Sequence, residues 1–167
     1  CEEQTYLKLG QLESRDQVET AIYLSKLPWV DAKHIGIWGW SFGGFNTLMS
    51  MSEGRPVFYA GVAVAPPTSW RYYDTVYTER FMRTPKENPE GYNCSPISRA
   101  KNLSGSLLII HGSADDNVHY RNVAEYTEAL VHADKDFRQL TYTNRNHSIY
   151  GGNTRNHLFR QLVNHFK

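Results

Sequence analysis

The chain has 167 residues, enough for one compact domain with an apolar core and too few for two ordinary domains. Hydrophobic residues make up 40% of the sequence and charged residues 21%, a balance that excludes a disordered or fibrous protein. The formal net charge is +1 and no basic stripe stands out, which argues against nucleic acid or an anionic membrane surface as a partner.

The first part of the chain alternates helical patterns with short β-branched runs. Residues 14–27 are predicted to form a helix capped by Ser14, because apolar side chains recur on one face. Residues 34–40 are a short buried strand, 42–52 a second helix and 59–65 a second strand. This alternation is typical of a parallel sheet covered by helices.

The second part continues the alternation after an irregular insertion. Residues 69–104 are rich in aromatic residues and proline, and we expect turns and short helices there. A strand at 106–111 and a helix at 118–132 follow. Residues 137–143 are predicted to form a fourth strand and 153–167 a closing helix. The expected fold class is α/β, a mainly parallel sheet with helices on both faces.

The cysteines carry no chemistry that we can identify. Cys1 and Cys94 could form at most one bridge, which is not a disulfide framework, and neither has the spacing of metal ligands. No apolar run approaches the roughly 20 residues that a membrane-spanning helix needs.

The strongest chemical signal is the sequence Gly-Trp-Ser-Phe-Gly at residues 39–43, which matches GxSxG between a strand and a helix. The turn around Ser41 is tight, so glycines two residues before and two after it are expected to avoid collisions. The amide of Phe42 would then face a developing oxyanion, and Gly44 would let the helix pack closely. Without this context, the motif could equally be a glycine-rich loop with a surface serine.

An acid and a base follow in the order that such a nucleophile requires. Asp115 and Asp116 come just after the predicted strand at 106–111, and His147 comes just after the last strand. Carboxyl ends of parallel strands meet at one edge of a sheet, so these side chains should gather near the serine. One of the two aspartates could be only a helix cap. His111 and His119 are interpreted as structural.

Four stretches of the chain resemble the catalytic domain of prolyl oligopeptidase family serine peptidases, in the dipeptidyl peptidase IV branch. They are IGIWGWSFGGF around Ser41, VAPPTSWRYYDTVYTERF at 64–81, IIHGSADDNVHY at 109–120 and YTNRNHSIYGG at 142–152. They cover most of the chain in the family's order, and the middle two are specific to this branch.

The resemblance implies a partial α/β-hydrolase fold and an activity. It selects Asp115 as the triad acid, beside Ser41 as nucleophile and His147 as base. It implies cleavage of dipeptides from peptide amino ends after a penultimate Pro or Ala through an acyl-enzyme, without metal or cofactor. The alternatives are a tripeptidyl or acylaminoacyl peptidase, an esterase, or a non-catalytic binding homologue. Retention of all three residues argues against the last.

The resemblance also implies a slot for the penultimate substrate residue, and a hydrogen bond from Asn117 to a substrate carbonyl. The residues that would line the slot are Phe42, Pro67, Trp70, Tyr73, Tyr77 and Val118. From the sequence pattern alone, Tyr73 and Tyr77 would be interpreted as aromatic core packing. Phe42 stands where the family usually has Tyr, Pro67 where it has Val, and Ser148 where it has Gly.

Members of the family carry an amino-terminal β-propeller and further strands ahead of this region. Those parts supply a second oxyanion donor and the acidic residues that hold the substrate's amino end. The resemblance therefore implies that residues 1–167 are the carboxy-terminal portion of a longer catalytic domain, and that the fragment alone could be inactive. It further implies a peptide substrate, a homodimer formed through the hydrolase domain, and an extracytoplasmic location.

Overall fold

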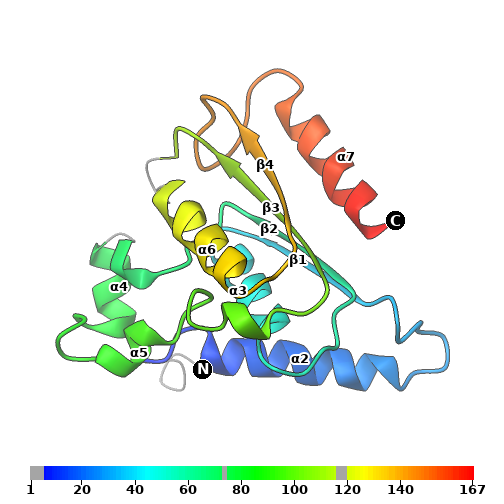
Figure 1. The fold of residues 1–167 in the computed structure, drawn as a ribbon, viewed down its shortest axis with the longest axis horizontal. Coiled ribbons are helices and arrows are strands. Elements are labelled where there is room, and N and C mark those ends of the chain that lie inside the picture. Colours follow the sequence, from blue (N-terminus) through cyan, green and yellow to red (C-terminus); the bar gives the residue numbers. More distant parts are fainter. Residues whose placement is uncertain (1–5, 73–74, 116–119) are drawn as a thin grey trace.

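Four parallel strands form the sheet at the centre of the computed structural model, which describes residues 6–72, 75–115 and 120–167 (Figure 1). The strands pair in chain order, so each neighbour in the sheet is also the next strand along the sequence. Their bounds are β1 (Gly36–Trp40), β2 (Ala60–Val64), β3 (Ser106–Gly112) and β4 (Arg138–Tyr142). Trp40 is in register with Val64, and Val64 with Ile110. The carboxyl ends of β1, β2 and β3 therefore lie at one edge.

Helices cover both faces of the sheet, as the sequence predicts (Figure 1). On one face, α7 (Thr154–Phe166) packs Leu158 and Leu162 against β2 and β3. The other face holds the larger apolar cluster, to which the α-helices α2 (Gln11–Ser25), α3 (Phe42–Met51) and α6 (Tyr120–His132) contribute. Alternate residues of a strand pack in the two clusters, because successive side chains of a strand point to opposite faces of the sheet. Val62 and Val64 face α7, whereas Ala63 faces the larger cluster.

The insertion between β2 and β3 forms short helices, as predicted. Its elements are η1 (Trp70–Tyr72), α4 (Thr75–Met82), α5 (Pro89–Asn93) and η2 (Ala100–Asn102). It encloses a third apolar cluster in which Trp70, Met82 and Tyr92 pack on Phe45 and Met49 of α3. The insertion is thus anchored to the helix that begins directly after Ser41.

The start of α2 corrects the predicted cap. The helix begins at Gln11, with Gly10 as its cap and Ser14 buried inside it. Gly10 has a φ of 89°, and its amide donates to the Glu13 carboxylate at 2.8 Å. A Cβ at Gly10 would lie 2.4 Å from the Phe45 ring, so only glycine fits the position.

Candidate active site

Three side chains predicted to act together come from loops at the same edge of the sheet. Ser41 directly follows β1, Asp115 lies in the loop after β3, and His147 lies in the loop after β4. Because all the strands are parallel, these loops share the edge where open α/β sheets place their sites.

Ser41 sits on a strained turn between strand and helix. Its backbone has φ 56° and ψ −117°, a conformation that residues other than glycine rarely adopt. Its amide donates to the carbonyl of Val64 at 2.8 Å, and its carbonyl accepts the amide of Phe45 at 3.0 Å. The serine is therefore fixed by the neighbouring strand on one side and by the first turn of α3 on the other.

Strained backbone gathers at this edge of the sheet. Ser41, Ala65, Asn144 and Ile149 all have positive φ, with values of 56°, 45°, 54° and 45°. Ala65 directly follows β2, and the other two flank His147. Each such conformation costs about 1–3 kcal/mol and persists only where the surroundings impose it, most often at functional sites.

The glycines around Ser41 are not equivalent, which corrects the expectation that the turn needs glycine both two residues before and two residues after the serine. A Cβ on Gly39 would lie 2.2 Å from the carbonyl carbon and oxygen of Gly43, so glycine is required before the serine. A Cβ on Gly43 would meet no described atom within 4 Å. Gly44 does allow close packing, because a Cβ there would lie 2.9 Å from the carbonyl oxygen of Val64.

Asp115 and His147 form a partly buried acid–base pair. Nδ1 of His147 lies 2.8 Å from Oδ2 of Asp115. The Asp115 side chain is fully buried, whereas 20% of the His147 side chain remains exposed. A carboxylate that accepts the Nδ1 proton holds the imidazole in the tautomer whose Nε2 can accept a proton. The arrangement suits a general base that works at the surface of the site.

His111, which the sequence predicts to be structural, lies against the same carboxylate. Its Nε2 is 3.8 Å from Oδ2 of Asp115, and both side chains are fully buried. The ring of Tyr120 stands edge-on to it at 5.8 Å. The position of His111 in β3, which leads into the Asp115 loop, is the sequence signal that could have indicated this contact.

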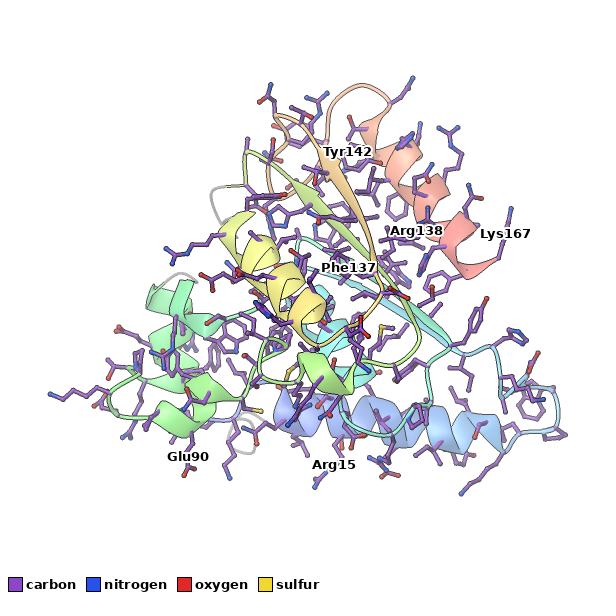
Figure 2. All side chains as sticks on the ribbon, in the orientation of Figure 1. Arg15, Glu90, Phe137, Arg138, Tyr142 and Lys167 are labelled. Atoms are coloured by element: carbon purple, nitrogen blue, oxygen red, sulfur yellow. The ribbon has the colours of Figure 1, made fainter. Side chains whose placement is uncertain are left out.

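Backbone hydrogen bonds join the loop that carries Asp115 to the loop that carries His147. The amide of Ala114, next to Asp115, donates to the carbonyl of Arg145 at 3.0 Å, and the amide of Ser113 donates to that of Tyr142. The Tyr142 hydroxyl pairs with Nδ1 of His157 in α7 at 2.5 Å, and Tyr142 is labelled at the end of β4 in Figure 2. Burial raises the pKa of the Tyr142 hydroxyl above its usual value, so the hydroxyl stays protonated in this contact.

The side chains of Ser41 and His147, both among the described residues, form no hydrogen bond with each other. Catalytic hydrogen bonds of unliganded sites are often long and tighten when substrate binds. A direct link between the two segments exists instead through the residue before the serine. The indole Nε1 of Trp40 donates to the backbone carbonyl of His147 at 3.0 Å. Sequence reasoning missed this bond, because no spacing indicates it.

The predicted oxyanion donor and part of the predicted slot lie beside the serine. Phe42 is the first residue of α3, where an amide has no acceptor within the helix. Its ring stacks on Phe45 at 5.8 Å and lies 6.0 Å from the buried ring of Trp70. Pro67 is buried in the segment after β2.

The rest of the predicted slot is not described. Tyr73, Asn117 and Val118 lie outside the described residues, and so does the side chain of Tyr77. Within the described parts of the chain, no group of three His, Cys, Asp or Glu side chains could hold a metal ion. No helix in those parts has the length and apolarity of a membrane span.

Comparison with known proteins shows that the chain is similar to serine peptidases. The model of the Prolyl oligopeptidase family matches residues 2–167. Dipeptidyl peptidase 4 of Felis catus is 45% identical over 164 residues, which cover 96% of this chain and 21% of that protein. Prolyl endopeptidase FAP of Mus musculus is 40% identical over 166 residues, which cover 97% of this chain and 22% of that protein.

Solved structures give the same result for the fold. The crystal structure of Porphyromonas gingivalis dipeptidyl peptidase 4 superimposes with a TM-score of 0.95 at 55% sequence identity. It covers 97% of this chain, and the chain covers 23% of that protein. This chain therefore spans between a fifth and a quarter of the length of these relatives.

Proposed function

This chain belongs to the prolyl oligopeptidase family, and from that premise we propose that it provides the catalytic triad of a serine peptidase. Ser41 is the nucleophile, His147 the general base and Asp115 the carboxylate that orients the base. The observation that carries the proposal is the 2.8 Å contact between the buried carboxylate of Asp115 and His147, at the sheet edge where Ser41 occupies a strained turn.

The proposed reaction proceeds through an acyl-enzyme. Oγ of Ser41 attacks the scissile carbonyl carbon while its proton passes to Nε2 of His147. The amide of Phe42 donates to the oxyanion that forms, and the partial positive charge at the start of α3 adds to this stabilisation. The imidazolium then gives its proton to the leaving amine. Water, deprotonated by His147, hydrolyses the ester and regenerates Ser41.

We further propose that the acyl group is a dipeptide whose second residue is Pro or Ala. Relatives named dipeptidyl peptidase 4 and prolyl endopeptidase support the dipeptide and the proline, respectively. Phe42, the residue after the serine, and Trp70, whose ring lies 6.0 Å from that of Phe42, support an apolar ring as ligand, because flat aromatic walls bury such a ring well. Tyr73, Tyr77, Asn117 and Val118 are proposed to complete this slot.

We also propose that residues 1–167 act as the carboxy-terminal part of a longer protein, because the chain matches only 21% to 23% of its relatives' length. The longer protein would supply a second oxyanion donor and the groups that bind the substrate's amino end. From the same likeness we propose an extracytoplasmic location and a homodimer formed through the hydrolase domain. Light scattering of the purified longer protein tests the dimer.

Turnover of a chromogenic Gly-Pro anilide by the longer protein tests this function, with the Ser41→Ala variant as its matched control. We expect release of the chromophore by the wild type and loss of release in the variant. A protein that hydrolyses only tripeptidyl or internal-peptide substrates would keep the nucleophile and overturn the dipeptide assignment. Equal release by the wild type and the variant would overturn the nucleophile.

A further inference from the structure

One side chain connects the nucleophile's turn to the loop that carries the base. Trp40 immediately precedes Ser41, and its indole Nε1 donates to the carbonyl oxygen of His147 at 3.0 Å. The indole is partly buried and belongs to the apolar cluster beneath α7. A movement of the His147 backbone away from Ser41 would break this bond.

A second side chain binds the next carbonyl of the same loop. Arg155, in the first turn of α7, donates from Nε and Nη2 to the carbonyl oxygen of Ser148 at 3.3 and 3.2 Å. Its guanidinium carbon also lies 5.9 Å from the centre of the Trp40 ring, at the outer limit of a cation–π contact. Successive carbonyls of the loop, at 147 and 148, are thus bound by two side chains that touch each other.

Phe159, one helical turn beyond Arg155 in α7, also packs near the Trp40 ring. Its ring lies 6.4 Å from Trp40 and 6.4 Å from Trp38, and residues four apart share one face of a helix. The indole is therefore enclosed by α7 on one side and joined to the loop by its N–H. The loop itself contains two residues with left-handed backbone, Asn144 and Ile149, so it needs outside contacts to hold its conformation.

We propose that Trp40 and Arg155 act as one latch that sets the position of His147 relative to Ser41. Both are positioning residues, since each acts through the backbone of the loop that carries His147. The latch serves acyl transfer and to that extent rests on the proposed function. It matters because no hydrogen bond joins the described side chains of Ser41 and His147, and a base displaced by about 1 Å costs about 100-fold in rate.

The test uses the longer protein with three substitutions at the latch and one control. Trp40→Phe keeps the ring and removes the N–H. Arg155→Met keeps a flexible apolar stem and removes the charge and both donors, whereas Arg155→Lys keeps the charge. Arg160→Met is the matched control, because Arg160 is also an exposed arginine of α7.

Three readouts are measured for every variant, together with the thermal midpoint. The first is the second-order rate at which a fluorophosphonate acylates Ser41, which does not depend on dipeptide recognition. The second is hydrogen exchange of residues 144–152, which does not depend on reactivity. A third, the split between kcat and KM on Gly-Pro anilide, shows whether substrate binding changes.

We expect Trp40→Phe to slow acylation about fivefold, the effect of one hydrogen bond. Arg155→Met should slow it about fivefold to tenfold, and Arg155→Lys should recover part of that loss. Exchange at 144–152 should rise in both loss variants, while KM and the thermal midpoint stay close to those of the wild type. The double variant should be slower than either single variant by less than the product of their effects, because the residues act together.

Acylation and loop exchange at wild-type values in Arg155→Met and Trp40→Phe would overturn the latch. So would an equal loss in Arg160→Met, or effects of the two substitutions that simply multiply. A wild-type protein that fluorophosphonate does not label would refute the proposed function instead. In that case the exchange of residues 144–152 still decides whether the latch holds the loop.

Discussion

Substitution of Gly39 by Ala should disrupt the turn on which Ser41 sits. The new Cβ would lie 2.2 Å from both the carbonyl carbon and the carbonyl oxygen of Gly43, and 2.8 Å from its Cα. These are backbone atoms, which cannot rotate aside as the end of a side chain can. Restoring ordinary van der Waals contact requires a displacement of more than about 1 Å between the end of β1 and the start of α3.

That displacement acts on stability and on rate. Overpacking of this kind costs about 1–3 kcal/mol of unfolding free energy, and we expect the upper end because both sides of the contact are backbone. Because Ser41 lies between Gly39 and Gly43, a shift of about 1 Å also moves its hydroxyl and should slow acylation about 100-fold. Denaturant unfolding and the rate of fluorophosphonate labelling measure the two effects separately.

Gly43→Ala is the matched control, since it adds the same methyl group at the other end of the motif. Its Cβ would meet no described atom within 4 Å, and Gly43 is not among the glycines with positive φ. We expect unchanged stability or a gain of about 0.4–1 kcal/mol from the reduced freedom of the unfolded chain. If Gly39→Ala were as stable and reactive as the wild type, or Gly43→Ala as damaged as Gly39→Ala, the account of the turn would be refuted.

Three further predictions concern the acid, a surface ion pair and the core. Asp115→Asn should lower kcat about 10,000-fold with the fold retained, because an amide can hold His147 in the wrong tautomer; a loss under tenfold would contradict this. The hydrogen bond from Arg55 holds the pKa of the Glu53 carboxyl below its usual value. The contribution of this pair to stability is therefore present above about pH 4.5, and it is lost as the pH falls through the folded-state pKa of Glu53. Glu53→Gln should therefore lower the midpoint of urea unfolding at pH 7 and leave it unchanged at pH 2; a pH-independent difference would contradict this. Leu130→Ala, at a fully buried position beneath the sheet, should cost about 2–5 kcal/mol of unfolding free energy, and a cost below 1 kcal/mol would show that the cluster repacks.

Local patterns were sufficient to predict the elements of the fold and the order in which the site residues appear. The β-branched runs before Ser41, Asp115 and His147 mark strands whether or not their neighbours are known. Once the strands are parallel and consecutive, the meeting of three loops at one edge follows from topology. These inferences depend only on residues close together in the chain.

The errors concern contacts between distant segments. Ser14 has the residue type of a cap, yet Gly10 takes that role because Phe45 of α3 leaves no room for a Cβ. The two glycines of the motif look symmetrical in sequence, but only a Cβ added at Gly39 would collide with backbone atoms. This difference depends on the direction in which α3 leaves the turn. The bond from Trp40 to the carbonyl of His147 joins residues 107 positions apart, and no pattern of spacing specifies it.

The most direct test of the central claim is to find which residue a fluorophosphonate modifies in the longer protein. Mass spectrometry of the labelled protein should place one adduct on Ser41, and labelling should slow at least 1,000-fold in His147→Gln, which removes the base. An adduct on a different residue, or equal labelling of Ser41 in wild type and His147→Gln, would contradict the assignment of Ser41 and His147 as a catalytic pair.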